Sequence, residues 1–329
     1  MEKRVLIAGG YGIVGSAIAK HIRKLDEEIE VIIGGRNPER GLGLAEEIGH
    51  ASTAYLDLTD IESVKAVGRV DLIVAALQDP ADTLIGYAIE NGIAHIGITK
   101  LADELAPLAA AALAHPAARP IVPLGHSQSG VLTVAALKLA QSFKRVDYIG
   151  LAGLYDEKEQ MGPMTLGDSE GFIGRALLRE DGNWAWVQAD ARPRGVEVAD
   201  GTFLEGLPMG LLDVPGLAAA TGAPNVRFDF IVGDSIGTKA GKLPSQDLYI
   251  EMEGELVEGQ FARRRLVVTD PFGQAHMTAL GVLLSIEAVL GLDGKTPAAG
   301  GLQLPESMLS IEAALSRLDQ FGVEIIELS

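Results

Sequence analysis

Residues 1–15 read MEKRVLIAGGYGIVG, and this stretch decides the fold. The apolar segment 5–8 is of buried-strand type and leads directly into Gly10, Gly12 and Gly15, which have the G-x-G-x-x-G spacing. An amphipathic helix at 16–24 and an apolar strand at 30–34 follow, in the order that a dinucleotide-binding βαβ unit requires. The first glycine allows a tight turn, the second lets backbone amides approach a pyrophosphate, and the third lets helix and strand pack closely. We therefore expect a dinucleotide to be bound by Gly9, Gly10, Tyr11, Gly12, Ile13, Val14 and Gly15.

The composition is that of a globular protein with about two domains. The chain has 329 residues, of which 47% are hydrophobic and 22% are charged. Its formal net charge of -18 argues against nucleic acid or an anionic membrane as a partner, because both require a basic surface. It has no cysteine, which excludes disulfides, thiolate catalysis and cysteine-ligated metals, and its histidines lack metal-ligand spacing. We expect a small-molecule substrate and no metal.

Two features of the sequence favour a cytoplasmic protein. The first strand begins within four residues of Met1, which leaves no room for a signal peptide. The longest apolar stretch, 277–292, contains Glu287 and is typical of a packed helix, not of a membrane span.

Strand and helix signals alternate through residue 125, which predicts a parallel sheet with crossover helices. Six strands are enough for a complete doubly wound sheet of Rossmann type. We therefore assign residues 1–126 to an N-terminal Rossmann domain that binds NAD(P). The expected strands are 4–9, 30–34, 52–56, 70–76, 94–98 and 119–124, and the expected helices between them are 38–48, 61–67, 80–90 and 103–114.

The pattern changes after residue 126. A helix at 128–141 and a strand at 148–156 precede a glycine-rich, acidic stretch at 156–181, in which 171–179 has a helical pattern. Strands without long helices between them predict a second α+β domain, 127–274, built on a mostly antiparallel sheet. Its extended segments are 184–192, 225–233, 247–256 and 260–270, and the last two are expected to form a hairpin. Helices at 274–290 and 310–321 and a strand at 323–328 complete the chain.

The end of the second strand indicates which dinucleotide binds. An NAD site places an acidic residue there, but the sequence is Gly34-Gly35-Arg36-Asn37. Arg36, with Arg40 one helical turn later, offers forked donors to a 2'-phosphate, so we expect NADP over NAD; alternatively, Arg36 stacks on adenine or lies in solvent. Because ligands bind at the carboxyl ends of parallel strands, residues after the third and fourth strands complete the predicted site. The further cofactor residues are Gly35, Arg36, Asn37, Arg40, Asp57, Leu58, Ala75, Ala76, Leu77 and Gln78.

Gly9, Gly12 and Gly15 also fit the G-x-x-G-x-x-G turn of short-chain dehydrogenases. That class predicts a Tyr-x-x-x-Lys pair for proton transfer, and none of the six tyrosines has a lysine four residues later. A short-chain catalytic site is therefore not expected.

Three segments of the chain resemble the saccharopine dehydrogenase-like family. They are VLIAGGYGIVGSAIAKHI (5–22) with VIIGGRNPER (31–40), DLIVAALQDPADTLIGYAIENGIAHIGIT (71–99), and GGLQLPESMLSIEAALSRLDQFGVEI (300–325). The resemblance is good over 1–130 and 270–329 and poor between them. It implies an NAD(P)-linked oxidoreductase that acts on an amino acid or imine. It also implies that 275–329 returns to pack on the first domain, and that the middle sheet shapes the substrate pocket and a homodimer contact.

The chain departs from that family's pattern at two places. His95-Ile96-Gly97 stands in the fifth strand, where members often carry an aspartate. Ser129-Gly130 replaces a frequent Pro-Gly after the sixth strand. The first departure leaves saccharopine or lysine specificity unsupported.

Hydride transfer is the cofactor's chemistry, so the protein must position the substrate and manage one proton. His126 follows the sixth strand, and imidazole titrates near neutrality, so His126 is the first candidate for proton transfer. Alternatively, His126 packs at the domain junction while Ser127 or Ser129 caps the next helix. Lys100, after the fifth strand, is the second candidate, with a solvated surface lysine as the alternative. Tyr155, at the end of a strand, is the third.

The middle of the chain supplies candidate substrate contacts. Arg175 can pair with a substrate carboxylate or with nearby acids, and Trp184 and Trp186 share a strand face that either walls an apolar pocket or lies in the core. His276 and Asp270 lie where the chain returns towards the first domain. The residues expected to bind substrate are Gln128, Arg175, Trp186 and His276.

The favoured hypothesis is an NADP(H)-dependent oxidoreductase that interconverts a small C=N and CH–NH compound carrying a carboxylate. A second hypothesis is reduction of a carbonyl or enoyl group on an apolar substrate, because the middle domain is weakly charged and contains aromatic residues. A third is a redox sensor that binds NADP without turnover.

Overall fold

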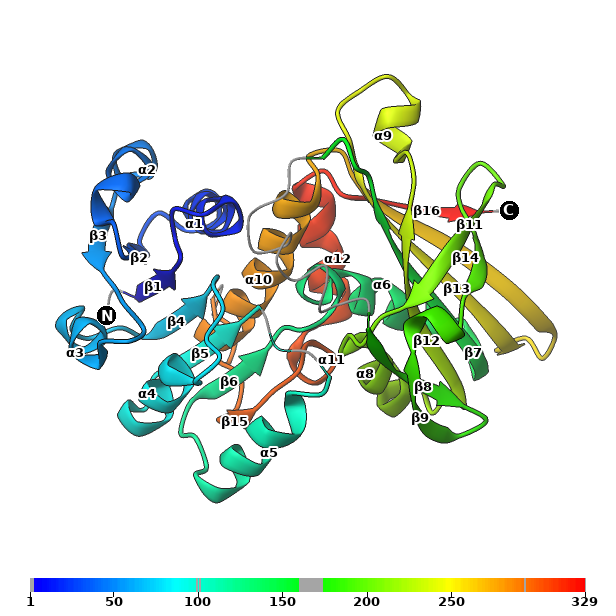
Figure 1. The fold of residues 1–329 in the computed structure, drawn as a ribbon, viewed down its shortest axis with the longest axis horizontal. Coiled ribbons are helices and arrows are strands. Elements are labelled where there is room, and N and C mark those ends of the chain that lie inside the picture. Colours follow the sequence, from blue (N-terminus) through cyan, green and yellow to red (C-terminus); the bar gives the residue numbers. More distant parts are fainter. Residues whose placement is uncertain (1–2, 99, 101, 160–173, 293, 329) are drawn as a thin grey trace. The chain divides into compact units, whose positions relative to one another are not determined.

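The computed structural model of the chain describes residues 3–98, 100, 102–159, 174–292 and 294–328 (Figure 1). The chain forms two compact units. The first comprises Met1–Lys100, Glu104–Gly125 and Thr278–Met308, and the second comprises Leu101–Asp103, His126–Met277 and Leu309–Ser329. Each unit is built around its own sheet.

The first unit contains a sheet with the strand order β15-β6-β5-β4-β1-β2-β3 (Figure 1). Every neighbouring pair is parallel, and Ala8 at the end of β1 pairs with both Gly34 and Ala75. Read from β3 to β6, this is the 3-2-1-4-5-6 order of doubly wound folds, so the predicted Rossmann sheet is confirmed. The strands are β1 (Arg4–Ala8), β2 (Glu30–Gly35), β3 (Ala51–Tyr55), β4 (Leu72–Ala75), β5 (Ala94–Gly97), β6 (Pro120–Pro123) and β15 (Gly301–Leu302).

Helices connect these strands and cover their apolar side chains. Leu84 and Ile85 of α4 and Leu108 of α5 pack in one hydrophobic cluster with Leu6 of β1 and Ile73 of β4. Burial of this cluster holds β1 beside β4 and so positions the turn that follows β1. The helical segments are α1 (Ile13–Leu25), η1 (Pro38–Gly41), α2 (Leu42–Ile48), α3 (Ile61–Ala66), α4 (Thr83–Asn91), α5 (Leu105–Ala114), α11 (Pro305–Met308) and the part of α10 (Gln274–Leu290) from Thr278 onward.

The second unit contains a mixed sheet with the order β10-β11-β12-β7-β13-β14-β16, and β8 pairs with both β12 and β9. β7 is parallel to β12, and the other pairs are antiparallel, which confirms the predicted mostly antiparallel sheet. The predicted hairpin is confirmed as β13 and β14. The strands are β7 (Phe143–Tyr155), β8 (Arg175–Glu180), β9 (Asn183–Gln188), β10 (Arg194–Glu197), β11 (Phe203–Pro208), β12 (Asn225–Val232), β13 (Gln246–Leu256), β14 (Phe261–Asp270) and β16 (Glu324–Leu328).

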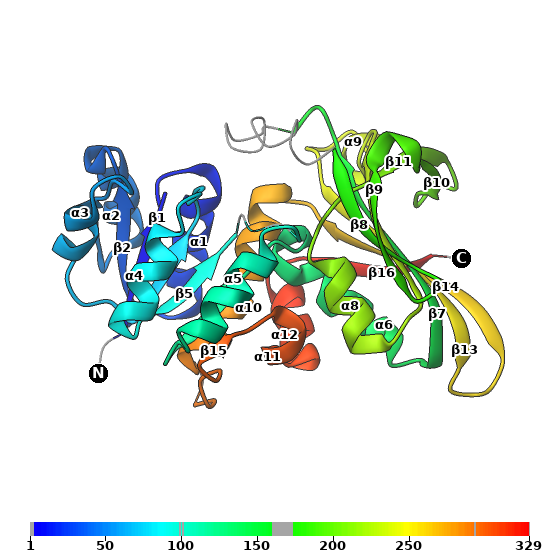
Figure 2. The same cartoon turned by 60° about the horizontal axis from the view of Figure 1, so that its bottom comes forward.

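Helices α6 and α8 contact this sheet, and α12 packs against α6 (Figure 2). Alternate residues of β7 and β13, such as Ile149, Leu151 and Ile250, are almost completely buried, as expected for strands covered by helices. The helical segments of this unit are η2 (Ser127–Gly130), α6 (Val131–Ala140), η3 (Ala189–Ala191), α8 (Asp213–Thr221), α9 (Ile236–Lys239), α12 (Ile311–Gln320) and the first turn of α10.

The segment around Arg175 differs from the sequence expectation. Arg175 begins strand β8 and does not lie in a helix, and β8 pairs with β9 across Asp181 and Gly182, which both have positive φ. An Asp-Gly loop of this kind is a strong signal for a hairpin, and it outweighs the short apolar run at 176–178. Residues 160–173, which include part of the expected acidic stretch and the start of the expected helix, lie outside the described residues.

Two other expectations need correction. The helix expected at 128–141 starts as the 3-10 turn η2, because Gln128 and Ser129 have φ values of +47° and +54°, and regular α-helix begins at Val131. The return of 275–329 to the first domain holds for 278–308 only. Residues 309–329 belong to the second unit, because β16 pairs with β14 in its sheet.

No helix among the described residues has both the length and the apolar character needed to cross a lipid bilayer. The longest apolar stretch of the sequence forms α10, as expected, and Leu280, Leu283 and Ile286 of this helix are fully buried.

Candidate functional site

The turn after β1 has no space for side chains at Gly9, Gly10 and Gly15. A Cβ on Gly9 would lie 2.6 Å from the carbonyl oxygen of Ala76, and one on Gly10 would lie 2.8 Å from that of Ile7. A Cβ on Gly15 would overlap the carbonyl oxygen of Gly9. Gly9 also has a φ of +79°, which only glycine adopts without strain. The backbone of the turn therefore packs directly on the end of β4 and on the first turn of α1.

The same turn prepares a site for an anion. The amides of Gly9 and Gly10 donate to the carbonyl oxygen of Gly34 at 2.9 and 3.2 Å, which fixes the turn to β2. Helix α1 begins at Ile13, and its N-cap residue Gly12 has no side chain that could accept its amides. The first turn of this 13-residue helix also has no acidic residue. Its positive end can therefore hold an anion such as a phosphate group.

Tyr11 connects this turn to the end of β2. The backbone amide of Asn37 donates to the Tyr11 hydroxyl at 3.2 Å, and the Arg40 guanidinium carbon lies 5.1 Å from the centre of the Tyr11 ring. A Cβ on Gly35 would lie 2.6 Å from the same hydroxyl oxygen. Gly35 is therefore required because the tyrosine ring crosses it, and Arg40 lies next to the turn through its contact with this ring.

Arg36 and Asn37 are exposed at the carboxyl end of β2, and Asp57 follows the neighbouring strand β3. The Asp57 carboxylate accepts hydrogen bonds from the backbone amide and the hydroxyl of Thr59, at 3.0 and 2.8 Å. These bonds, helped by the positive charge of Arg36, lower the pKa of Asp57. The end of the site next to β2 and β3 therefore carries two arginines, Arg36 and Arg40, and one ionised carboxylate.

The segment after β4 lies on the other side of β1. Ala75 is buried, and Ala76 donates its amide to the last residue of β1 at 2.9 Å. Leu58 and Leu77 pack against the hydrophobic cluster of the first unit, whereas Gln78 is exposed. The structure thus brings the predicted cofactor residues to the carboxyl ends of β1, β2, β3 and β4.

Lys100 is not a solvated surface lysine. Its side chain is only 9% exposed, and its ammonium group lies 2.6 Å from the Asp82 carboxylate and 3.4 Å from that of Glu104. Burial opposes the charged form, but these two carboxylates outweigh burial and raise the pKa of Lys100. Lys100 therefore stays protonated at neutral pH, and it links the start of α4 to the start of α5.

His95 stands in β5, where the resembling family often has an aspartate. It is 2% exposed, and no hydrogen-bond partner for its Nε2 is found among the described residues. Burial, with a smaller effect from the charge of Lys100, lowers its pKa to about 3. His95 is therefore a neutral core residue at physiological pH.

His126 is the N-cap residue of η2 in the second unit, and it is 5% exposed. The next residues are held by the fully buried Asp213, which accepts from the amide of Ser127 at 2.6 Å and from the hydroxyl of Thr133 at 2.7 Å. Gln128 lies in the same turn with a positive φ. His126 and Gln128 therefore lie in one turn, which Asp213 holds through the amide of Ser127.

Tyr155 and Arg175 lie at strand ends of the second unit, and Trp186 lies on β9. The Tyr155 ring stacks on Phe230 with 5.9 Å between ring centres. Arg175 lies over the Trp186 ring at 4.5 Å, and the neighbouring Trp184 makes the same contact with another arginine. Trp184 and Trp186 are 48% and 40% exposed, so these side chains lie neither in the core nor in an enclosed apolar pocket.

His276, in the first turn of α10, pairs with Asp270 at the end of β14. Its Nδ1 lies 2.7 Å from Asp270 Oδ2, and Asp270 is fully buried. The sequence singles out both residues but not their pairing, because nothing local in it indicates that the start of a helix folds back on the preceding strand. Two further acids of this unit, Glu159 and Asp247, were missed, and Asp247 is fully buried. Within the described part of the chain, no group of three or more acidic or histidine residues is arranged to hold a metal ion.

Asp156 provides a prediction about pH. Burial raises its pKa, but hydrogen bonds from the Thr238 hydroxyl and from the amides of Ser235 and Lys158 outweigh burial and lower it to about 2. A carboxyl group whose pKa is lowered by folding stabilises the fold at pH values above its unfolded-state pKa, which is near 4. This contribution to stability is lost as the pH falls towards 2. We expect the stability difference between the wild type and Asp156→Asn to shrink by about 2 kcal/mol between pH 5 and pH 2. Urea unfolding across this range measures it, and a difference that does not change with pH would contradict the assignment.

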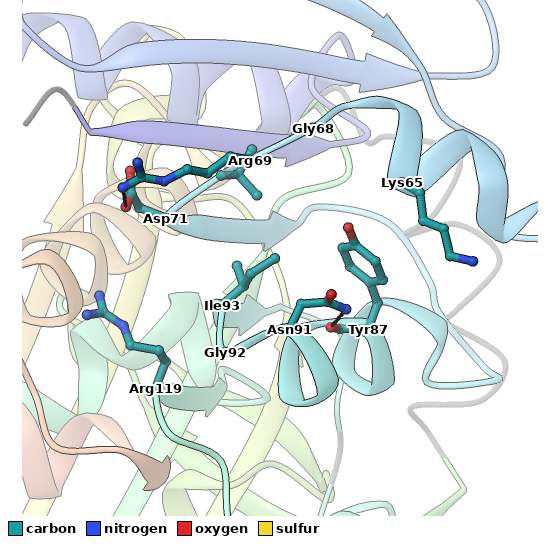
Figure 3. Close-up of a pocket in the computed structure, with 10 residues that line it drawn as sticks. Lys65, Gly68, Arg69, Asp71, Tyr87, Asn91, Gly92, Ile93 and Arg119 are labelled. Carbon is teal, nitrogen blue, oxygen red and sulfur yellow. Dashed lines mark hydrogen bonds and ion pairs between the residues drawn. The ribbon is translucent and has the colours of Figure 1, made fainter.

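A hollow of about 540 Å³ lies in the first unit, lined by residues such as Lys65, Arg69, Tyr87 and Arg119 (Figure 3). Asp71 and Ile93 precede β4 and β5, so the hollow lies at the amino ends of these strands. Ligands of doubly wound sheets bind at the carboxyl ends. The hollow is therefore on the opposite edge of the sheet from the glycine turn and is not the dinucleotide site.

Comparison with solved structures identifies the fold. Saccharopine dehydrogenase (L-Glu forming) from Saccharomyces cerevisiae matches with a TM-score of 0.72 at 13% identity, over 99% of this chain and 100% of that chain. Homospermidine synthase from Legionella pneumophila, solved in complex with NAD, matches with a TM-score of 0.64 at 11% identity, over 99% of this chain and 91% of that chain. The sequence matches no protein-family model and none of the curated proteins. At these identities the similarity establishes a shared fold.

Proposed function

We propose that this chain, which has the fold of saccharopine dehydrogenase, is an NADP(H)-dependent oxidoreductase that interconverts C=N and CH–NH bonds in a small amino acid or imine. The observation that carries the proposal is the turn after β1, where a Cβ at Gly9, Gly10 or Gly15 would meet backbone atoms. Nucleotide-binding turns need such glycines because the pyrophosphate lies close to the backbone. When bound, the nicotinamide supplies or accepts the hydride.

The proposed cofactor residues follow the carboxyl edge of the sheet. The pyrophosphate would lie on the glycine turn and the first amides of α1, the adenosine beside the ends of β2 and β3, and the nicotinamide ribose beside the end of β4. Support comes from the uncapped α1 and from the two arginines at the end of β2. The proposed residues are Gly9, Gly10, Tyr11, Gly12, Ile13, Val14 and Gly15 for the pyrophosphate, Gly35, Arg36, Asn37, Arg40, Asp57 and Leu58 for the adenosine, and Ala75, Ala76, Leu77 and Gln78 for the nicotinamide ribose.

The preference for NADP is tested with Arg36→Ala. A hydrogen bond to a charged group contributes about 2 kcal/mol, so we expect about a 30-fold loss of affinity for NADPH and less than about a threefold loss for NADH. Calorimetric titration of both dinucleotides measures this difference. Arg69→Ala is the matched control, because Arg69 is an exposed arginine at the opposite edge of the same sheet. Equal losses for both dinucleotides would mean that Arg36 stacks on adenine, and no binding of any nicotinamide dinucleotide to the wild type would remove the proposed function.

The substrate class is supported by the resemblance to the saccharopine dehydrogenase-like family and by the first structural neighbour, whose name states that it forms L-Glu. The proposed substrate residues are Gln128, Arg175, Trp186 and His276, which all belong to the second unit. Oxidation of NADPH with a panel of keto acids plus ammonia or amines, compared with ketones and enones alone, tests the class. Turnover of the ketones or enones alone would show that the substrate is a carbonyl or enoyl compound and not an imine. The cofactor assignment would stand.

His126, Tyr155 and Lys100 are the sequence-derived candidates for moving the proton. Lys100 has a raised pKa and two carboxylate partners, so it cannot act as a base near neutral pH. His126 and Tyr155 remain proposed candidates for this role.

We also propose that the enzyme is a cytoplasmic homodimer. The family resemblance supports the dimer. Light scattering after size-exclusion chromatography tests the dimer, and a monomer mass would contradict it.

A further inference from the structure

The side chain of Tyr11 joins the glycine turn to the segment that follows β2, and both belong to the first unit. The Tyr11 ring lies across Gly35, where a Cβ would come within 2.7 Å of the ring carbon that bears the hydroxyl. The hydroxyl accepts a hydrogen bond from the amide of Asn37 at 3.2 Å. Gly35 is buried and Tyr11 is half-buried, so the ring rests on the backbone at the end of β2.

Arg40 lies over the Tyr11 ring, with 5.1 Å between the guanidinium carbon and the ring centre. This distance is within the range of a cation–π contact. The turn η1, which carries Arg40, packs closely on β2, because a Cβ on Gly41 would lie 2.9 Å from the Ile33 side chain. The amide of Arg40 also donates to the carbonyl oxygen of Asn37 at 3.1 Å. The backbone of η1 and the ring of Tyr11 together keep the Arg40 guanidinium beside the glycine turn.

The two arginines after β2 differ in their surroundings. Hydrogen bonds from Thr59 and, to a smaller extent, the charge of Arg36 lower the pKa of Asp57, so Arg36 lies near a carboxylate that balances part of its charge. In the described part of the chain, Arg40 has no carboxylate within ion-pair distance. A contact with an aromatic face leaves the N–H donors of a guanidinium available to phosphate oxygens. Arg40 is therefore an exposed cation whose charge is not neutralised by an ion pair among these residues.

We propose that Tyr11 is the positioning residue that sets the preference for NADP, by holding Arg40 where the 2'-phosphate of the dinucleotide would lie; this role rests on the proposed function. In doubly wound folds the end of the second strand contacts the adenosine ribose, so a guanidinium fixed there distinguishes a 2'-phosphate from a 2'-hydroxyl. A long side chain that is already oriented loses less conformational entropy when the ligand binds. The ring of Tyr11 carries no charge, so its effect on the preference depends on Arg40.

The first test replaces the ring with an apolar side chain in Tyr11→Leu. We expect the dissociation constant for NADPH, divided by that for NADH, to rise about fivefold, which is the size of an exposed cation–π contact. Calorimetric titration of both dinucleotides measures this ratio. Tyr11→Phe keeps the ring, and the exposed amide of Asn37 can bond to water, so a change of less than about twofold is expected. An unchanged ratio in Tyr11→Leu, or equal changes in Tyr11→Leu and Tyr11→Phe, overturns the proposal.

Tyr87→Leu is the matched control for the loss of a tyrosine ring. Tyr87 is a half-buried tyrosine of the same unit, and it lines the hollow at the opposite edge of the sheet (Figure 3). Its substitution is expected to leave both dissociation constants unchanged. The same rise in the ratio for Tyr87→Leu and Tyr11→Leu would mean that the effect is not local to the glycine turn, and it overturns the proposal.

The second test asks whether Tyr11 acts through Arg40. Arg40→Ala is expected to raise the ratio about 30-fold, because it removes a charged hydrogen-bond donor to the 2'-phosphate. Two residues that act through one contact are not additive, so adding Tyr11→Leu to Arg40→Ala is expected to change the ratio by less than about twofold. A further rise of about fivefold in the double variant would show that Tyr11 acts independently of Arg40, and it overturns the proposal.

A second pair of ligands separates the 2'-phosphate from the pyrophosphate, because Arg40 lies beside the glycine turn as well as after β2. Adenosine 2',5'-bisphosphate and 5'-AMP differ only in the 2'-phosphate, and neither contains a pyrophosphate. Tyr11→Leu is expected to weaken binding of the bisphosphate about fivefold relative to 5'-AMP. Equal losses for the two ligands would mean that Arg40 serves a phosphate that NAD and NADP share, and they overturn the proposed role.

The role of Tyr11 and the proposed function fail in different ways. If the wild type prefers NADPH and Tyr11→Leu keeps that preference, the role of Tyr11 is wrong and the proposed function stands. If the wild type binds NADH as tightly as NADPH, both this role and the NADP preference are wrong, and the rest of the proposed function stands. If the wild type binds no nicotinamide dinucleotide, the proposed function is wrong and the role of Tyr11 falls with it.

Discussion

Gly15→Ala is expected to weaken NADPH binding by about 100-fold, because overpacking at a closed site costs up to about 3 kcal/mol. The added Cβ would overlap the carbonyl oxygen of Gly9 and lie 2.8 Å from the Cα of Gly10. Both neighbours are backbone atoms, so no side-chain rotation can relieve the contact. Either α1 or the turn must move, and this separates the helix amides from the position of the pyrophosphate. Calorimetric titration with NADPH measures the loss.

Gly43→Ala is the control for this variant. Gly43 lies in α2, the next helix, and a Cβ there would have nothing within 4 Å. Its substitution is expected to leave NADPH affinity unchanged and to stabilise the protein by up to about 1 kcal/mol, because alanine restricts the unfolded chain more than glycine does. Wild-type affinity in Gly15→Ala would mean that the turn tolerates a side chain, and the main support for a dinucleotide site would be lost.

Asp229→Ala is expected to lower the free energy of unfolding by about 3 to 5 kcal/mol, because it removes the buried carboxylate that two mostly buried guanidinium groups share and leaves Arg194 with the more distant Glu251 carboxylate, at 3.7 Å. Asp229, in β12, is fully buried and pairs with both Arg194 and Arg227, whose side chains are 16% and 18% exposed. The Arg227 Nε lies 2.9 Å from one Asp229 oxygen. Both guanidinium groups must then either stay buried with fewer acceptors or move into water. Urea unfolding followed by circular dichroism measures the change.

Asp147→Ala is the matched control on the neighbouring strand β7. Asp147 also pairs with an arginine, Arg145, at 2.7 Å, but the two side chains are 34% and 61% exposed. Exposed ion pairs are worth less than about 1 kcal/mol, so a small change is expected. Equal losses in both variants would show that burial does not set the strength of the Asp229 network. Binding of NADPH is expected to survive in Asp229→Ala under native conditions, because Asp229 belongs to the second unit.

Local sequence signals explain how much of the first unit could be predicted. The apolar runs at 5–8, 31–33 and 72–75 predict buried strands, and the glycine spacing after the first predicts the turn. Those features depend on residues within a few positions of each other. Where the local signal was misread, as at Arg175, the Asp-Gly loop at 181–182 was the stronger clue to the strand.

The candidate site was only partly predictable for the same reason. Tyr11 was expected to touch the cofactor, but its contact with Asn37 and Arg40 depends on how the end of β2 lies beside the turn. Lys100 reads as a surface residue, yet Asp82 reaches it from the start of α4. Partners that come from different elements leave no periodic pattern in the sequence.

The sequence by itself determined the doubly wound sheet and the glycine turn, because short-range sterics and hydrophobic periodicity act within single elements. Only the tertiary structure decided which polar groups meet: Asp270 with His276, Asp229 with two arginines, and residues 309–329 with the second sheet. Such pairings require strands and helix ends that are already packed, since a buried charge is stable only where its partner has been brought to it.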